Sequence, residues 1–251
     1  MSEANMDEAG KAGKNNPAAN WAHPVNNLKA NVAEKKAPNR VDGRQLLGAL
    51  QGFGPMWQKT YTITLRDTKN SPAYIITTWK ENFGCFWPTV NRFYAPITGI
   101  QPGEIGLIKG SVPGGLTLST GVMVIYVDEE SFTFMTPQGH IFAGWVTFSA
   151  YQDSNHTRVQ VQVLMRSPDP LIEMALRMGG HRAEDQFWLQ TLENLSRYFG
   201  EDARAQASII CLDKKIQWRE IRNLRHNGII GSTFYTFTAP VRLLGANRRK
   251  K

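Results

Sequence analysis

Cysteine is scarce in this sequence, and long apolar runs are missing. Cys85 and Cys211 are the two cysteines of the 251 residues, and neither lies in a redox or metal-binding motif. The pair therefore indicates reduced thiols and a cytoplasmic protein, and a disulfide framework is excluded. No stretch approaches the roughly 18 apolar residues that cross a bilayer. The polar, acidic start Met1–Asn5 lacks the apolar centre of a secretory signal.

Catalytic and metal-binding motifs are also missing. The five histidines show no metal-ligand spacing with another histidine, a cysteine or a carboxylate, so neither a metal nor a cofactor is expected. The glycine-rich segment 111–115 lacks the spacing of a phosphate-binding loop. His140, which begins a strand at a turn, is the candidate for acid–base chemistry, with Glu104 as a candidate carboxylate. The alternative is a turn histidine that bonds only to nearby backbone.

Positive charge is concentrated near the C-terminus. Residues 201–251 hold 11 basic and four acidic residues, whereas residues 41–200 hold 12 basic and 13 acidic ones. This basic C-terminal extension, residues 201–251, is a candidate for weak contact with nucleic acid or an anionic membrane. A solvated basic surface is the alternative. The candidate contact residues are Lys215, Arg219, Arg222, Arg248 and Arg249.

The N-terminal residues form two segments of different composition. Residues 1–40 are rich in Asn, Ala, Lys and Pro, which predicts a flexible arm. Residues 41–56 predict a short helix over Val41–Leu50 followed by a linker that contains Gly and Pro.

Alternating apolar residues predict an antiparallel sheet. In Thr157–Met165 the alternation is strict, which predicts a strand with one buried and one solvated face. Further strands are expected over Trp57–Leu65, Leu118–Asp128, Ser131–Thr136 and Ile141–Tyr151, and a short one at Ile105–Ile108. A meander of this size must cover its apolar face with another layer.

Two helices supply candidates for that layer. Ser71 and Pro72 form a helix start, with Trp79 among the apolar residues that follow. The best helical pattern covers Ala183–Phe199, after a shorter helix that is expected to stop at Gly179 and Gly180. Its stripe of Trp188, Leu192, Leu195 and Phe199 is expected to face the sheet, and Glu184, Asp185 and Glu193 are expected to face solvent. Beyond Gly200, Ser208–Leu212 predicts a strand and Lys214–Arg225 a helix.

This order of elements resembles the START-like (SRPBCC, helix-grip) superfamily. The residues that carry the resemblance are Ser71-Pro72, Trp87-Pro88, the Gly139-His140 turn, the Gly144–Phe148 strand and Thr191–Leu195 in the last helix. The Gly-His turn is similar to an uncharacterised subgroup of that superfamily. The resemblance implies an α+β domain over residues 57–200, in which a curved antiparallel sheet wraps around a long C-terminal helix and leaves an internal cavity.

The resemblance and the lack of a catalytic motif favour binding or transport of a small apolar or amphipathic ligand in that cavity. The expected ligand-binding residues are Trp79, Trp87, Tyr126, Trp145, Met165, Trp188 and Leu192. One alternative is a cyclase- or hydrolase-like enzyme that uses His140 and a nearby carboxylate. The other is docking of the basic C-terminal extension on a polyanion or an anionic membrane. The sequence leaves the oligomeric state open.

Overall fold

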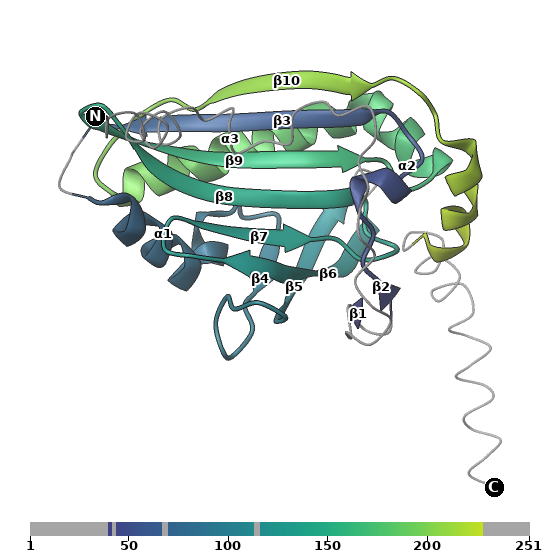
Figure 1. The fold of residues 1–251 in the computed structure, drawn as a ribbon, viewed down its shortest axis with the longest axis horizontal. Coiled ribbons are helices and arrows are strands. Elements are labelled where there is room, and N and C mark those ends of the chain that lie inside the picture. Colours follow the sequence, from purple (N-terminus) through teal and green to yellow (C-terminus); the bar gives the residue numbers. More distant parts are fainter. Residues whose placement is uncertain (1–39, 42–43, 67–69, 113–115, 228–251) are drawn as a thin grey trace, which may run out of the picture. The chain divides into compact units, whose positions relative to one another are not determined.

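A computed structural model describes residues 40–41, 44–66, 70–112 and 116–227 (Figure 1). Residues 1–39 of the expected arm, and the candidate contact residues Arg248 and Arg249, lie outside the described residues. Eight strands form one antiparallel sheet in the order β10-β3-β9-β8-β7-β6-β5-β4. They are β3 (Met56–Leu65), β4 (Arg92–Tyr94), β5 (Ile105–Val112), β6 (Leu116–Val127), β7 (Ser131–Met135), β8 (Ala143–Asp153), β9 (His156–Arg166) and β10 (Gln206–Asp213).

The helices connect these strands or follow them. They are η2 (Ala49–Gln51), α1 (Pro72–Glu81), η3 (Phe83–Phe86), α2 (Pro170–Ala175), η4 (Leu176–Gly180), α3 (His181–Tyr198) and η5 (Trp218–His226). The start of α1 is as expected, because the Ser71 hydroxyl accepts a hydrogen bond from the Tyr74 backbone N–H at 3.2 Å. The long helix expected over Ala183–Phe199 is confirmed as α3.

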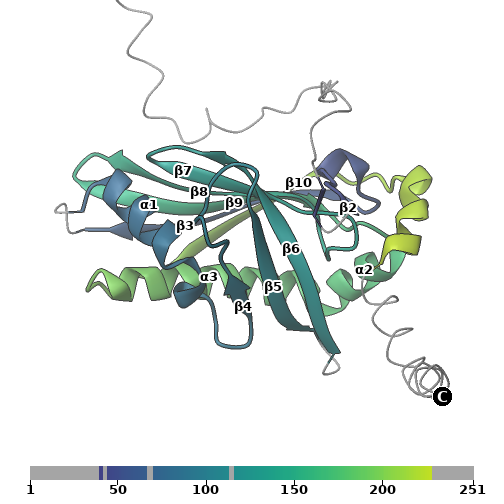
Figure 2. The same cartoon turned by 90° about the horizontal axis from the view of Figure 1, so that it is seen from below.

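The protein has the expected α+β helix-grip architecture. Figures 1 and 2 show α3 extended along β3 and β9 on one face of the sheet. Strands β5 and β6 run at an angle to β3 and β9, so that the sheet is curved. We call the face that packs against α3 the inner face, and the opposite one the outer face. On β3 the inner face carries Lys59, Tyr61, Ile63 and Leu65, all buried.

Cross-strand pairs of apolar residues build the core on the inner face. Tyr61 lies opposite Val161, which lies opposite Phe148, which in turn lies opposite Phe132. From α3, Leu192 and Leu195 are completely buried against this layer, and Trp188 and Phe199 pack on it while half-buried. The apolar stripe of α3 therefore faces the sheet as predicted.

The prediction of a helix over Val41–Leu50 is wrong. The chain instead forms two short paired strands, β1 (Arg40–Val41) and β2 (Arg44–Gln45), and then η2. The β7–β8 connection holds this segment extended, because the Leu47 N–H donates to the Thr136 carbonyl at 2.8 Å and the Gln138 N–H to the Gln45 carbonyl at 2.8 Å. Tertiary hydrogen bonds thus override the local helical pattern.

The outer face of β9 is not solvated, contrary to expectation. Gln160, Gln162, Leu164 and Arg166 on this face are all buried. Gln160, for example, donates from Nε2 to the Ser149 hydroxyl at 2.9 Å on the neighbouring strand. Strict alternation showed that the two faces of the strand differ in polarity, but polarity alone does not establish contact with water.

The helix before α3 stops at the glycine pair, as expected. Met178 (φ −82°, ψ 19°) and Gly179 (φ 120°, ψ −6°) leave the helical conformation, and a φ of 120° is one that a residue with a side chain rarely adopts. The glycines therefore bend the chain between two helices, and α3 begins at His181.

The sheet continues past Gly200, where the domain was expected to end. Strand β10 pairs with β3 along its whole length and becomes one edge of the sheet. The helix expected over Lys214–Arg225 is the shorter 3₁₀ helix η5. Its first residue, Trp218, packs edge-on against Phe53 at a ring-centroid distance of 5.4 Å. Part of the basic C-terminal extension is thus built into the same unit as the sheet.

Candidate functional site

Five of the seven expected ligand-binding residues lie between the inner face and its helices. Met165 comes from β9, Trp79 from α1 and Trp87 from the residue after η3, while Trp188 and Leu192 come from α3. Trp79, Met165 and Leu192 are fully buried, whereas Trp87 is 8% exposed and Trp188 is half-buried. These residues form the candidate site.

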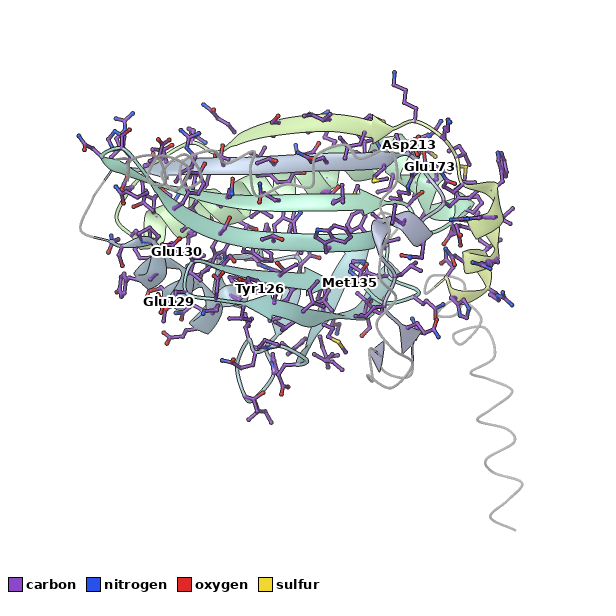
Figure 3. All side chains as sticks on the ribbon, in the orientation of Figure 1. Tyr126, Glu129, Glu130, Met135, Glu173 and Asp213 are labelled. Carbon is purple, nitrogen blue, oxygen red and sulfur yellow. The ribbon has the colours of Figure 1, made fainter. Side chains whose placement is uncertain are left out.

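Tyr126 and Trp145 lie on the outer face, away from the other five residues. Tyr126, labelled in Figure 3, pairs with Thr133 and is half exposed, with its hydroxyl donating to Asp128 at 2.7 Å. A β-bulge between Val124 and Tyr126 shifts the phase, so that Tyr126 points opposite to the buried Val124. Trp145 pairs with Leu164, one residue out of phase with the inner residues Val146 and Phe148.

Aromatic rings form most of the candidate site. The ring centroid of Trp87 lies 5.0 Å from that of Phe187 and 6.5 Å from that of Trp188, both on α3. Trp188 in turn lies 5.5 Å from Phe148 of β8. Most of these contacts are edge-to-face, which suits the charge distribution of aromatic rings. Trp188 therefore connects the loop after η3 to the centre of the sheet.

Two indole N–H groups in this aromatic layer have no hydrogen-bond acceptor among the described residues. They are Nε1 of Trp79 and Nε1 of Trp87, and both atoms are buried. A buried donor without an acceptor costs about 1–3 kcal/mol. These two N–H groups are thus unsatisfied hydrogen-bond donors among otherwise apolar side chains.

A group of ionisable side chains lies beside the aromatic layer, at the start of α3. Lys59 of β3 is 1% exposed, and its Nζ lies 2.8 Å from Glu184 Oε2 and 2.7 Å from Asp185 Oδ1. The Tyr61 hydroxyl donates to the same Asp185 oxygen at 2.6 Å. The expectation that Glu184 and Asp185 face solvent is therefore wrong, because Lys59 draws both carboxylates toward the sheet.

The burial of this cluster shifts the acid–base properties of its members. Burial raises the pKa of Glu184 to about 7, although Lys59 and a hydrogen bond from the Trp188 indole oppose the shift. Burial, followed by the nearby Glu184 and Asp185 carboxylates, raises the pKa of Tyr61. Burial and the charge of Lys59 lower the pKa of His181. The cluster can therefore exchange a proton near neutral pH at Glu184.

The sequence contained a signal for this cluster. Lys59 falls in the same alternation phase as Tyr61 and Ile63, so a strand with an apolar inner face must bury it. Glu184 precedes Trp188 by four residues and therefore lies on the apolar stripe of α3. A carboxylate near the N-terminus of a helix is also favoured by the helix dipole when it faces solvent, so the sequence alone does not distinguish the two placements.

His140 and Glu104, the candidates for acid–base chemistry, each make a hydrogen bond with nearby or neighbouring-strand backbone. The His140 Nδ1 atom accepts a hydrogen bond from the Phe142 N–H at 3.0 Å, and burial lowers the pKa of this histidine to about 4. The Glu104 carbonyl accepts from the Val124 N–H at 2.9 Å. Within the described part of the chain, no hydrogen bond or ion pair joins the two residues, and the contact of His140 with the Phe142 backbone is the one expected of a turn histidine.

The described polyanion candidates lie together around η5. Arg219 and Arg222 both contact the buried Glu220, at 2.9 and 3.2 Å. Lys215 is held through its backbone, since its N–H donates to Asp213 at 2.9 Å and its carbonyl accepts from Arg166 at 3.0 Å. No group of three metal-ligating side chains occurs among the described residues.

The fold and the site together define an α+β protein that holds an aromatic layer and a buried ionisable cluster between a curved sheet and one long helix. No protein-family model matches the chain, and no curated protein matches it either. Among solved structures, the chain is similar to the di-domain ARO/CYC StfQ from the steffimycin biosynthetic pathway, with 8% identity, coverage of 57% of this chain and 50% of that chain, and a TM-score of 0.45.

Two smaller solved proteins are similar over nearly the same share of the chain. TTHA0849 from Thermus thermophilus has 14% identity, with 55% of this chain and 93% of that chain covered, at a TM-score of 0.43. Protein Ms6760 from Mycobacterium smegmatis has 12% identity, with 56% and 89% covered, at a TM-score of 0.40.

Proposed function

We propose that this protein binds a small amphipathic molecule between the inner face of the sheet and α3. The ligand is mostly apolar, and it carries an oxygen that accepts a hydrogen bond. The observation that carries the proposal is the Trp87 indole N–H, which is buried in an aromatic layer and has no acceptor among the described residues. A ligand oxygen at this position would remove the cost of the unsatisfied donor.

The surroundings of Trp87 support a ligand with a flat apolar body. Phe83, Phe93, Phe187 and Trp188 all present rings to Trp87 at centroid distances between 5.0 and 6.5 Å. Such linings, apolar with a few placed polar groups, are typical of small-molecule sites. All four rings belong either to the short segments η3 and β4 or to the half-buried part of α3, which can adjust around a ligand more easily than the central strands.

A matched pair of small aromatic molecules tests the proposal. Naphthalene and 1-naphthol share the same apolar rings, and only 1-naphthol carries an oxygen. Each would displace 8-anilinonaphthalene-1-sulfonate from the folded protein, with fluorescence as the measurement. We expect 1-naphthol to bind about tenfold more tightly than naphthalene, since satisfying a buried donor is worth about 1–3 kcal/mol.

Two variants assign that preference to Trp87. Trp87→Phe keeps the ring packing and removes the N–H group, so the preference for 1-naphthol should disappear while naphthalene still binds. Trp218→Phe, a change at an exposed tryptophan, is the matched control and should leave the preference intact. If the folded protein binds neither probe molecule up to its solubility limit, the proposal is wrong.

A further inference from the structure

Large apolar side chains are exposed on α2, η4 and η5. Met178 is 81% exposed and Trp218 is 68% exposed. The other large apolar residues exposed on these elements are Leu171, Met174 and Ile221. Leu171, Met174 and Met178 recur at intervals of three and four residues, as one side of a helix does. A concentration of exposed apolar residues in neighbouring elements is typical of an interaction surface.

The elements that carry these residues are joined to one another. Asn223 of η5 donates from Nδ2 to the Pro168 carbonyl at 3.0 Å, just before α2, and Asn227 donates to Asp169 at 2.7 Å. Figures 1 and 2 both show α2 and η5 at the same end of the sheet, where Glu173 and Asp213 are labelled in Figure 3. We call the exposed residues of 170–182 and 214–226 the α2–η5 surface.

The charge that the α2–η5 surface presents to solvent is positive. Its two sequence segments contain seven basic residues and two acidic ones, Glu173 and Glu220. Both acidic residues are buried, with Glu173 paired to Arg177 at 2.6 Å and Glu220 paired to Arg219 and Arg222. Lys214, Lys215 and Arg225 are exposed in addition. The acidic groups lie below the surface, and the basic groups lie on it.

We propose that the α2–η5 surface docks the protein on an anionic lipid bilayer. The exposed Met, Ile, Leu and Trp side chains enter the boundary between headgroups and acyl chains, while Lys and Arg contact lipid phosphates. The apolar side chains favour a bilayer over nucleic acid, because a phosphate backbone offers them no apolar partner. No helix in the described residues is long and apolar enough to span a membrane, and docking from one side needs none.

Sedimentation with vesicles tests this inference on the full chain. Vesicles of phosphatidylcholine alone and vesicles with about one-third phosphatidylserine would be compared at low and at physiological salt. We expect binding to the anionic vesicles, at least about tenfold weaker binding to neutral ones, and weakening with salt, because each basic residue near the surface adds attraction that salt screens.

Matched variants locate the contact. Lys215→Gln/Arg225→Gln and Met174→Gln/Met178→Gln should each weaken binding to the anionic vesicles about tenfold or more. The controls at the opposite edge of the sheet are Arg92→Gln/Lys109→Gln and Ile97→Gln/Leu107→Gln, which remove equally exposed basic and apolar residues and should leave binding unchanged. Circular dichroism and thermal melting would confirm that each variant is folded.

Four outcomes would overturn the inference. The wild-type chain could fail to bind anionic vesicles, or the control variants could weaken binding as much as the α2–η5 variants. Binding could also be lost in Arg248→Gln/Arg249→Gln and kept in both α2–η5 variants, which would place the contact in the C-terminal residues. Tighter retention of a DNA duplex than of vesicles, insensitive to Met174→Gln/Met178→Gln, would identify nucleic acid as the partner instead.

Discussion

At the scale of single residues, Lys59 is the most unusual feature of the protein. A lysine that is buried in the middle of an apolar strand face needs a compensating charge, and α3 supplies two carboxylates within 2.8 Å. Such a pair contributes little net stability relative to an apolar pair, but removing one partner leaves an uncompensated buried charge. The cluster therefore fixes how α3 lies on β3 more than it stabilises the fold.

Lys59→Met should lower the free energy of unfolding by about 3–5 kcal/mol, because Glu184 and Asp185 lose their cation inside the protein. The double variant Lys59→Met/Glu184→Met should regain much of this loss, since it replaces the buried pair by apolar side chains. Urea denaturation measures both. Lys109→Met, at an exposed lysine, is the control and should change stability by less than about 0.5 kcal/mol. A loss below about 1 kcal/mol in the single variant would contradict the buried pairing.

Glu184 should make stability depend on pH in a defined window. Its pKa is raised from 4.5 to about 7 in the folded protein, so folding favours the protonated form. Its contribution is fully present below the unfolded value of 4.5 and is lost as the pH rises through about 7. Relative to wild type, Glu184→Gln should therefore become progressively more stable between these two pH values. Urea denaturation of both proteins across the window measures this difference, and a constant difference would refute the shift.

At the scale of elements, Arg166 joins three segments at the end of β9. This buried side chain donates to the Gly54 carbonyl before β3, to the Lys215 carbonyl before η5 at 3.0 Å, and to the Asp213 carboxylate at the end of β10. The hydrogen bond from the Gln217 N–H to the Phe53 carbonyl, 2.8 Å long, adds a second connection. Together they attach the basic segment around η5 to the sheet.

Arg166→Met should lower the free energy of unfolding by about 3–5 kcal/mol, because it leaves buried acceptors and a carboxylate without a donor. Hydrogen exchange should also accelerate in residues 206–226 more than in β8. Arg158→Met on the same strand is the matched control. It removes a partly exposed ion pair with Asp153 and should cost less than about 1 kcal/mol. Unchanged exchange in residues 206–226 would show that Arg166 does not hold this segment.

The sequence predicted the long elements and missed the junctions between them. The central strands and α3 have strong periodic patterns, and their positions agree with expectation to within a few residues. The segment over Val41–Leu50 has a weaker pattern, and its hydrogen bonds to the β7–β8 connection come from residues far along the chain. The bulge that turns Tyr126 outward depends on pairing with β7, which no local pattern encodes.

At the scale of the whole described unit, the order of the strands could be predicted only in part. The neighbours β6, β7, β8 and β9 are consecutive and follow from short turns. Strand β3 instead lies between β9 and β10, which both come much later in the sequence. For the candidate site, the resemblance predicts Trp79, Trp87 and Trp188, whereas the Lys59 cluster depends on the same long-range arrangement of β3 against α3.

During refolding, the backbone amides of β3 should therefore become protected from hydrogen exchange later than those of β7 and β8. The β7–β8 pair forms from residues close in sequence, whereas Trp57 must meet Met165 and Cys211. Local contacts form faster than distant ones because less chain entropy is lost in closing the loop. Pulsed hydrogen exchange during refolding should show amides of β7 and β8 protected before those of β3. Simultaneous protection of all three strands would indicate that the sheet forms in one step.

Because β3 pairs with β9 and β10, which come later in the sequence, it also lacks its partner strands while the protein is being synthesised on the ribosome. At about 5–20 residues per second, β3 is made on the order of ten seconds before β9 and longer before β10. During that interval both edges of β3 and its apolar residues Tyr61, Ile63 and Leu65 have no partner strand from the same chain. The nascent chain is therefore exposed to aggregation until β9 and β10 have been made, so its yield in a cell should depend on chaperones that bind the growing chain.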